Sequence, residues 1–186
     1  MTKGRELSRS IVIICLAVSI ILASTVAFSE GWSNPMRLTY AMSAIDDIEC
    51  NTTEYAVFHI HAHLDIFIDG KPISVPSQIG INTDAGCLYW LHTHDDSGVI
   101  HIESPLEREF TLGNFFDIWG ESFNNTHLFD GEVTNNTLSV YVNGNKVPTD
   151  MDYRSINLNA HDEIVIVYGV MPSDKIPSNY EFARGL

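Results

Sequence analysis

The feature that most constrains the fold of this chain is a strict alternation of two kinds of side chain along one segment. Over residues 58–68 the even positions are apolar, and the odd positions include His59, His61, His63 and Asp65. A repeat of two residues places successive side chains on opposite faces of a β-strand and does not fit the period of a helix. We therefore expect one long, half-buried strand, with apolar side chains in the core and the histidines together on the other face.

Turn and cap residues divide the rest of the chain into short elements. Asp69-Gly70 and Asn143-Gly144 are typical of two-residue hairpin turns, and Thr111 and Gly120 are typical of the two ends of a helix. The expected strands cover residues 73–75, 88–94, 99–103, 138–142 and 163–168, and the expected helix covers 112–119. The predicted fold class is mainly β (α+β), rich in hairpins, with one short helix and a β-grasp-like arrangement in the C-terminal half.

An uncharged stretch near the N-terminus predicts a membrane segment. Residues 11–28 carry no charge and follow Lys3, Arg5 and Arg9. Such a stretch is at the short end of what spans a bilayer, and the basic flank indicates that the N-terminal side is cytoplasmic. We expect a retained transmembrane helix and an extracytoplasmic domain; the alternative is a cleaved signal peptide and a secreted domain. The predicted division is a membrane segment (1–28), a stalk (29–50), a β-rich His-cluster domain (51–172) and a polar tail (173–186).

The charge of the residues after this segment excludes one class of partner. Residues 29–186 hold 7 of the 10 Lys and Arg residues and 23 of the 24 Asp and Glu residues, which leaves a net charge of −16. Such a domain repels phosphate backbones and attracts cations, so we expect no nucleic-acid partner. The chain is also 45% hydrophobic and only 18% charged, which argues against a disordered protein.

Two cysteines lie outside the apolar stretch, Cys50 and Cys87. In an exported domain such a pair predicts a disulfide. The alternative is two free, buried thiols.

The histidines form two clusters whose strand register can be predicted. If residues 95–98 form a four-residue turn, His92 lies directly opposite His101, and His94 and Glu103 lie on the same face of the hairpin. Directly opposed Cβ atoms are about 4.5–5.5 Å apart, and diagonal neighbours are within reach of long side chains. If the first strand lies beside this hairpin, up to six imidazoles converge.

Converging imidazoles predict a metal site, because imidazole is the commonest protein ligand of zinc and copper. Neither Cys nor Met occurs in the clusters, which favours Cu(II) or Zn(II) over Cu(I). The candidate ligands are His59, His61, His63, His92, His94 and His101. Asp65, Asp95 and Glu103 are candidates for alternative ligands, for groups that orient the imidazoles, or for a general base. A solvent-facing row of histidines without metal and a pH-responsive cluster are the alternatives, and His127 and His161 are expected at the surface.

The run YWLHTHDDSGVIHIESP, residues 89–105, resembles the signature of an uncharacterised prokaryotic group of membrane-anchored or exported His-rich domains found in bacteria and archaea. The resemblance extends to HIHAHL at residues 59–64, IGI at 79–81 and FTLGNFFDIWG at 110–120. It spans about a third of the chain and implies a shared architecture and a shared site. It implies no particular reaction and says nothing of the residues beyond 120.

Three functions fit these observations. The first is a single-pass, extracytoplasmic protein that binds or delivers Cu(II) or Zn(II), or serves as an accessory to a membrane metalloenzyme, with a membrane protein as its partner. The second is a His-ligated metalloenzyme for hydrolysis or oxygen chemistry, in which an acidic residue acts as the base. The third is a surface interaction module that binds no metal.

The predicted topology can be tested in intact cells. We expect a protease added from outside to degrade residues 29–186. The reason is that Lys3, Arg5 and Arg9 keep the N-terminal end of the membrane segment in the cytoplasm, which places the residues after it outside. Immunoblotting with an antibody against the C-terminal residues would follow the loss. Full protection in intact cells, with degradation after lysis, would contradict the orientation.

Overall fold

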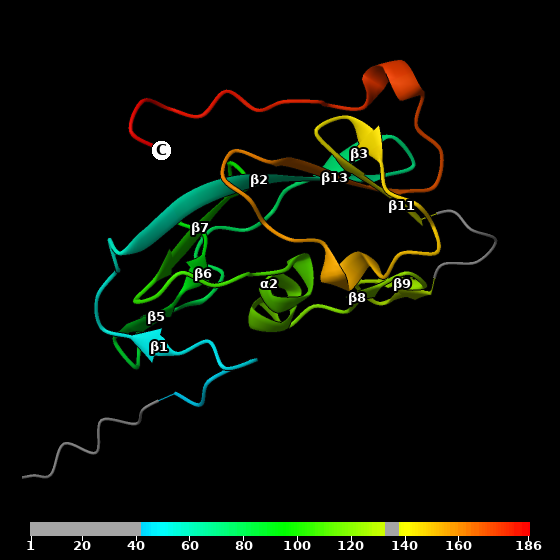
Figure 1. The fold of residues 1–186 in the computed structure, drawn as a ribbon. Helices are drawn as coiled ribbons and strands as arrows, with labels where there is room; N and C mark the ends of the chain where they lie inside the picture. Colours follow the sequence, from blue (N-terminus) through cyan, green and yellow to red (C-terminus); the bar gives the residue numbers. More distant parts are fainter. Residues whose placement is uncertain (1–41, 133–137) are drawn as a thin grey trace, which may run out of the picture. The chain divides into compact units, whose positions relative to one another are not determined.

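One strand, β2 (Phe58–Ile68), organises the main sheet of the protein. The computed structural model describes residues 42–132 and 138–186. β2 pairs antiparallel with β7 along its first half, and with β3 antiparallel and β13 parallel along its second half. The sheet has seven strands in the order β12-β11-β13-β2-β7-β6, with β3 attached to β2 (Figure 1). The other strands of this sheet are β3 (Lys71–Ile73), β6 (Leu91–His92), β7 (Val99–Ser104), β11 (Leu138–Val142), β12 (Asn145–Lys146) and β13 (Glu163–Tyr168).

Two small sheets and three short helices complete the described part of the chain. The first small sheet has the order β1-β5-β4 and the second has the order β10-β9-β8. Their strands are β1 (Cys50–Asn51), β4 (Ile81–Asn82), β5 (Cys87–Tyr89), β8 (Phe123–Asn124), β9 (His127–Leu128) and β10 (Gly131–Glu132). The helices are α2 (Leu112–Trp119) and the 3₁₀-helices η1 (Tyr153–Ser155) and η2 (Ser173–Lys175). The expected class, mainly β with one α-helix, is confirmed for these residues.

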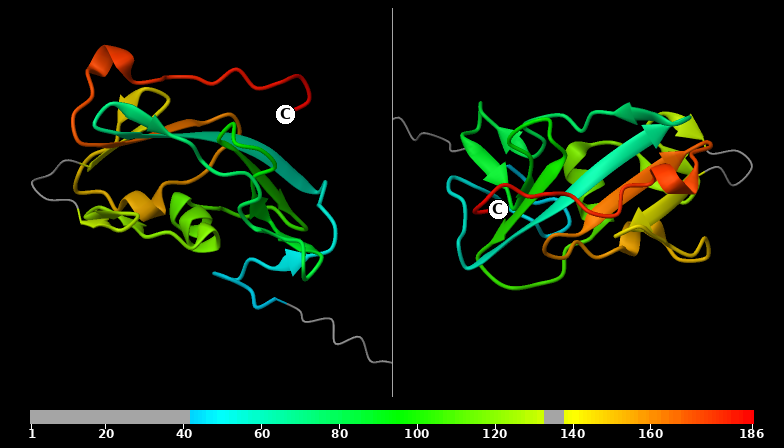
Figure 2. Two further views of the ribbon diagram at one scale, coloured as in Figure 1. Left: turned by 180° about the vertical axis from the view of Figure 1, so that it is seen from behind. Right: turned by 90° about the horizontal axis from the view of Figure 1, so that it is seen from above.

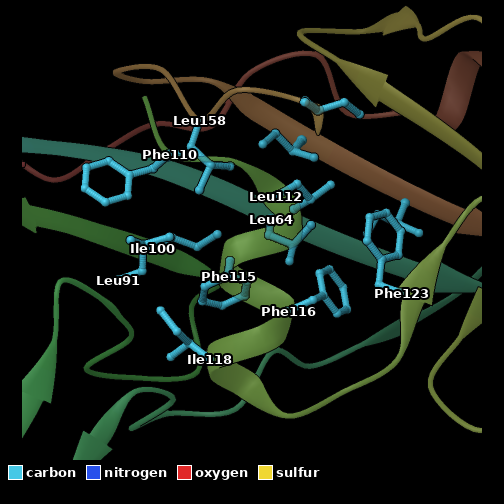
Figure 3. Close-up of a cluster of buried hydrophobic side chains, with 14 of the residues drawn as sticks. Leu64, Leu91, Ile100, Phe110, Leu112, Phe115, Phe116, Ile118, Phe123 and Leu158 are labelled. Carbon is cyan, nitrogen blue, oxygen red and sulfur yellow. The ribbon is translucent and has the colours of Figure 1, made fainter. Parts of the chain in front are cut away.

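The helix α2 covers one face of the main sheet and forms the core with it (Figure 3). Its bounds are those predicted from Thr111 and Gly120: the Thr111 side chain accepts a hydrogen bond from the Asn114 amide, and Gly120 takes a left-handed conformation with φ 80°. Phe115 and Phe116 of the helix are fully buried in one cluster with Leu64 of β2. The apolar positions of β2 are therefore fixed toward α2.

The opposite face of the sheet, which carries the histidines, is covered by the C-terminal residues. This segment runs back across β2 (Figures 1 and 2), and the Tyr180 ring stacks on the His63 ring with centroids 3.8 Å apart. His63, beneath this ring, is 4% exposed, and His61 on the same face is 5% exposed. The expectation of a half-buried β2 is therefore wrong over these residues, and at His63 the predicted polar tail, 173–186, supplies the cover.

The predicted disulfide is present. Cys50 of β1 and Cys87 of β5 are bonded, with Cα atoms 5.4 Å apart. The preceding residues, assigned to a stalk on the sequence, also pack on this part of the fold: Ile48 is fully buried, and the Tyr89 hydroxyl donates to the Ser43 carbonyl at 2.9 Å. The described end of the predicted stalk is therefore continuous with the β domain.

Two predicted strands have different bounds in the structure. The strand expected over 73–75 corresponds to β3, Lys71–Ile73, which pairs with the end of β2. The strand expected over 88–94 is divided into β5 and β6 at Trp90, whose indole N–H donates to the Asn51 side chain at 2.6 Å. The β-grasp-like arrangement was expected within residues 138–169, but β13 pairs with β2 as well as with β11. The central parallel pair therefore joins the two halves of the chain.

Within residues 42–132 and 138–186, no helix has the length and apolar character needed to cross a membrane. The predicted membrane segment, 1–28, lies outside the described residues.

The disulfide predicts a measurable loss of stability. Replacing Cys50 and Cys87 together by Ser should lower the free energy of unfolding by about 3–4 kcal/mol, because the bond closes a loop with a separation of 37 residues. Urea denaturation of the full chain measures this loss. The variant Cys15→Ser, which leaves the bond intact, is the matched control. A double variant as stable as that control would contradict the prediction.

Candidate metal centre

Strand pairing brings five of the eight histidines together across β2, β7 and β6. His61 of β2 lies opposite His101 of β7, and His92 of β6 lies opposite the same His101 on its other side. His59 lies opposite Glu103. The predicted register of His92 and His101 is therefore confirmed, and β2 is the neighbouring strand that the sequence left open. We call His59, His61, His92, His94 and His101 the imidazole cluster.

On the β2 side of the cluster, three imidazoles and one carboxylate have ligand atoms within 4.8 Å of one another. The Nε2 atoms of His59 and His61 are 3.1 Å apart, and His61 Nε2 is 3.2 Å from His101 Nδ1. Glu103 Oε1 lies 3.1 Å from His59 Nε2 and 3.4 Å from His101 Nδ1. Two nitrogens that each lie about 2.0–2.1 Å from one zinc ion are ~3.4 Å apart at the tetrahedral angle and ~2.9 Å at a right angle. The observed separations fall between these values.

On the β6 side, His92 and His94 face each other with their Nε2 atoms 3.2 Å apart. The Nδ1–H of His92 donates to the Tyr89 carbonyl at 2.9 Å, which leaves the Nε2 lone pair free to bind an ion. His94 is 44% exposed, and its Nε2 is 3.4 Å from the exposed carboxylate of Glu54. This edge of the cluster is open to solvent.

Burial favours the neutral form of His61 and His92. Desolvation, with help from neighbouring imidazoles, lowers the pKa of His61 to about 4. Desolvation likewise lowers the pKa of His92 to about 4. Burial alone would raise the pKa of Glu103, but its hydrogen bond to His101 and the charges of His92 and His59 outweigh burial and lower it. At neutral pH His61 and His92 are therefore neutral and Glu103 is ionised, which are the protonation states that metal ligands need.

Glu103 is also incompletely satisfied. Its side chain is 3% exposed, and its Oε1 contacts His59 and His101. Its second oxygen, Oε2, is buried and has no hydrogen-bond partner. A buried carboxylate oxygen without a partner is costly, and a cation in the cluster would remove that cost.

His63 lies apart from the imidazole cluster. Its Nδ1 is 2.8 Å from the Glu163 carboxylate, and its Nε2–H donates to the Ser97 carbonyl at 2.8 Å. The set His63, Asp65 and Glu163 is close enough to hold an ion, but both nitrogens of His63 already have protein partners. Burial lowers the pKa of His63, but the hydrogen bond and charge of Glu163 outweigh it, so that the pKa is raised. The structure thus supports His63 as a partner of Glu163, and the prediction that it joins the other five histidines does not match its position.

The remaining sequence candidates have other contacts. Asp95 accepts a hydrogen bond from the Ser97 amide at 3.0 Å, and this contact with Ser97 lowers the Asp95 pKa. His161 is exposed and lies 3.3 Å from the Leu186 carbonyl, and His127 contacts the Thr126 hydroxyl at 2.9 Å. Asp95 therefore stabilises the turn between His94 and β7. His127 and His161 belong to none of the possible metal-holding sets of the described residues.

Two acidic residues at the site were not predicted. Glu163 begins the strand EIVIVY and pairs with His63 across the parallel β13–β2 contact. Its position as the one charged residue of an apolar strand was a usable signal. Glu54 lies in the loop before β2, and nothing in the local sequence relates it to His94.

Comparisons of the chain with models of protein families, with curated proteins and with solved structures found no match. The arguments for function therefore rest on the geometry of the site.

The lowered pKa values predict how the metal-free protein responds to acid. His61 and His92 each have a pKa of 6.5 in the unfolded chain and of about 4 in the folded protein. Between these values the unfolded chain binds more protons, so the free energy of unfolding decreases as the pH falls from 6.5 toward 4. His92→Gln removes one of the two such groups, so its free energy of unfolding should decline less over this window. Urea denaturation at several pH values measures the slope, and His127→Gln serves as the control. Identical slopes for wild type and His92→Gln would contradict the lowered pKa.

Proposed function

We propose that this protein binds a divalent transition metal, Cu(II) or Zn(II), in the imidazole cluster. The observation that carries the proposal is the buried Glu103 Oε2 without a partner, next to imidazole nitrogens 3.1–3.2 Å apart. An ion at this place would receive the lone pairs of the imidazoles and the charge of the carboxylate together. No other group of described residues combines an unsatisfied buried acid with several imidazoles.

Burial argues against a solvent-facing row of histidines that binds nothing. His92 is fully buried and His61 is 5% exposed, so both have lost their contacts with water. Buried polar groups need compensating partners, and the His61 ring finds only other imidazoles at its Nε2. The pKa of about 4 for both residues also lies below the range in which histidine switches act, which argues against a pH-responsive module.

The ligand set favours zinc or copper(II) over other ions. Imidazole nitrogens with one carboxylate suit Zn(II) and Cu(II), whereas calcium and magnesium prefer oxygen ligands. Cysteine thiolates, which select Cu(I), are absent from the sets of described residues that could hold an ion. The nitrogen–nitrogen distances of 3.1–3.2 Å lie between those expected for tetrahedral and for right-angle coordination, so they agree with either ion.

The open edge at His94 and Glu54 supports a role in which the ion is exchanged. A purely structural zinc site is closed on all sides, whereas here two side chains of the site are 44% and 52% exposed. We propose metal binding or delivery, or service as an accessory to a membrane metalloenzyme, by a domain anchored outside the cytoplasm through residues 1–28. The same edge favours a second candidate, a metalloenzyme in which Glu54 acts as the base toward a metal-bound water.

Glu103 gives the sharpest test of the metal site. Glu103→Gln keeps the shape of the side chain and removes its charge, so we expect the affinity for Zn(II) or Cu(II) to fall by at least about tenfold. Competition with a chromogenic chelator measures this affinity. The matched control is Glu107→Gln, at an exposed position outside the imidazole cluster. A wild-type chain that binds neither ion, or a Glu103→Gln variant of unchanged affinity for both, would overturn the proposal.

A further inference from the structure

Two sets of possible metal ligands in the imidazole cluster share one histidine, His101, and a third set, Glu54, His92 and Glu103, brings Glu103 within 4.8 Å of His92 as well. The inner subsite contains His59, His61, His101 and Glu103, and the outer subsite contains His92, His94 and His101. In each subsite the ligand atoms lie within 4.8 Å of one another. His101 belongs to both subsites, because β7 lies between β2 and β6 in the sheet.

One ion cannot take all of these ligands. Two ligand atoms on the same zinc ion, each about 2.1 Å from it, are at most ~4.2 Å apart. No set formed by the described residues joins His59 or His61 to His92 or His94 within 4.8 Å. His59 and His61 therefore bind a different ion from His92 and His94.

The two ring nitrogens of His101 fit this division. Its Nδ1 faces the inner subsite, 3.2 Å from His61 Nε2 and 3.4 Å from Glu103 Oε1. Its ring stands nearly perpendicular to the rings of His61 and His94, with centroids 4.5 Å and 4.4 Å away, and is stacked on the His92 ring at 5.4 Å. With Nδ1 used on the inner side, Nε2 is the nitrogen left for the outer subsite.

We propose that the imidazole cluster holds two divalent ions, bridged by His101 as an imidazolate; this rests on the metal-binding function proposed above. Each ion binds one nitrogen of the bridging ring. The ring gives up its N–H proton to solvent when the second ion binds, and no other bond breaks. In typical two-metal sites the ions are about 3.5–4 Å apart. A bridging imidazolate ring places its two ions further apart, because one ion binds each of its two nitrogens.

The two subsites differ in the number of protein ligands that each offers. The inner subsite has four protein ligands, which complete a tetrahedral set around one ion, although His59 is 41% exposed. The outer subsite has three imidazoles and is exposed at His94, which leaves a coordination position for water or a small anion. The inner ion therefore stays with the fold, and the outer ion is the one that exchanges with a partner or meets a substrate.

Metal stoichiometry of the full-length chain tests the two positions. After loading with Zn(II) and dialysis, elemental analysis should give two ions per wild-type chain and one ion per His94→Ala chain, because only the outer subsite loses a ligand. His94 is exposed, so this change should not affect folding. The matched control His127→Ala should keep two ions. No bound ion in wild type would overturn the proposed function itself, whereas a single ion would leave that function standing and overturn the two-ion proposal.

Loading with Cu(II) tests the bridge separately. Two copper(II) ions joined by an imidazolate couple antiferromagnetically, so the electron paramagnetic resonance intensity of wild type should fall well below its copper content. His94→Ala, with one copper, should show the full intensity. Two coppers with full intensity in wild type would overturn the bridge.

Discussion

The antiparallel pairing of β2 with β7 is the constraint on which the candidate site depends. It sets His61 opposite His101 and His59 opposite Glu103, and a shift of one residue would turn one of the two sets to the other face of the sheet. What opposes the shift is the packing on the other face, where Leu64 is buried in one cluster with Phe115 and Phe116 of α2. The hydrophobic core thus fixes the register, and the register fixes the distances between imidazoles on the opposite face.

The sequence predicted those features that depend on residues close together in the chain. The bounds of α2 follow from the hydrogen bond at Thr111 and the left-handed Gly120, and both are local. The opposition of His92 and His101 follows from the length of the turn between them. The disulfide between Cys50 and Cys87 was predicted from the count of cysteines and the expectation of an exported domain, without any geometry.

The features that sequence analysis missed depend on distant segments. Glu163 meets His63 across 100 residues, and a parallel pair has no turn to set its register. The burial of His63 depends on Tyr180, which reaches it from outside the sheet. One signal was available: EIVIVY has no polar–apolar alternation after its first residue, as expected for a strand buried on both faces. It indicated that something covers the face that β2 presents with its histidines.

The parallel contact between β2 and β13 also has a consequence for the order in which the protein can be completed during synthesis. β2 is made early, but its partner on one side is made about a hundred residues later, after both hairpin strands and α2. Until β13 has emerged, β2 keeps an unpaired edge and the carboxylate that binds His63 is missing. Contacts of such long sequence separation slow folding. A chain of this topology can therefore remain open during synthesis, and His63 is covered only after β13 and Tyr180 have been made.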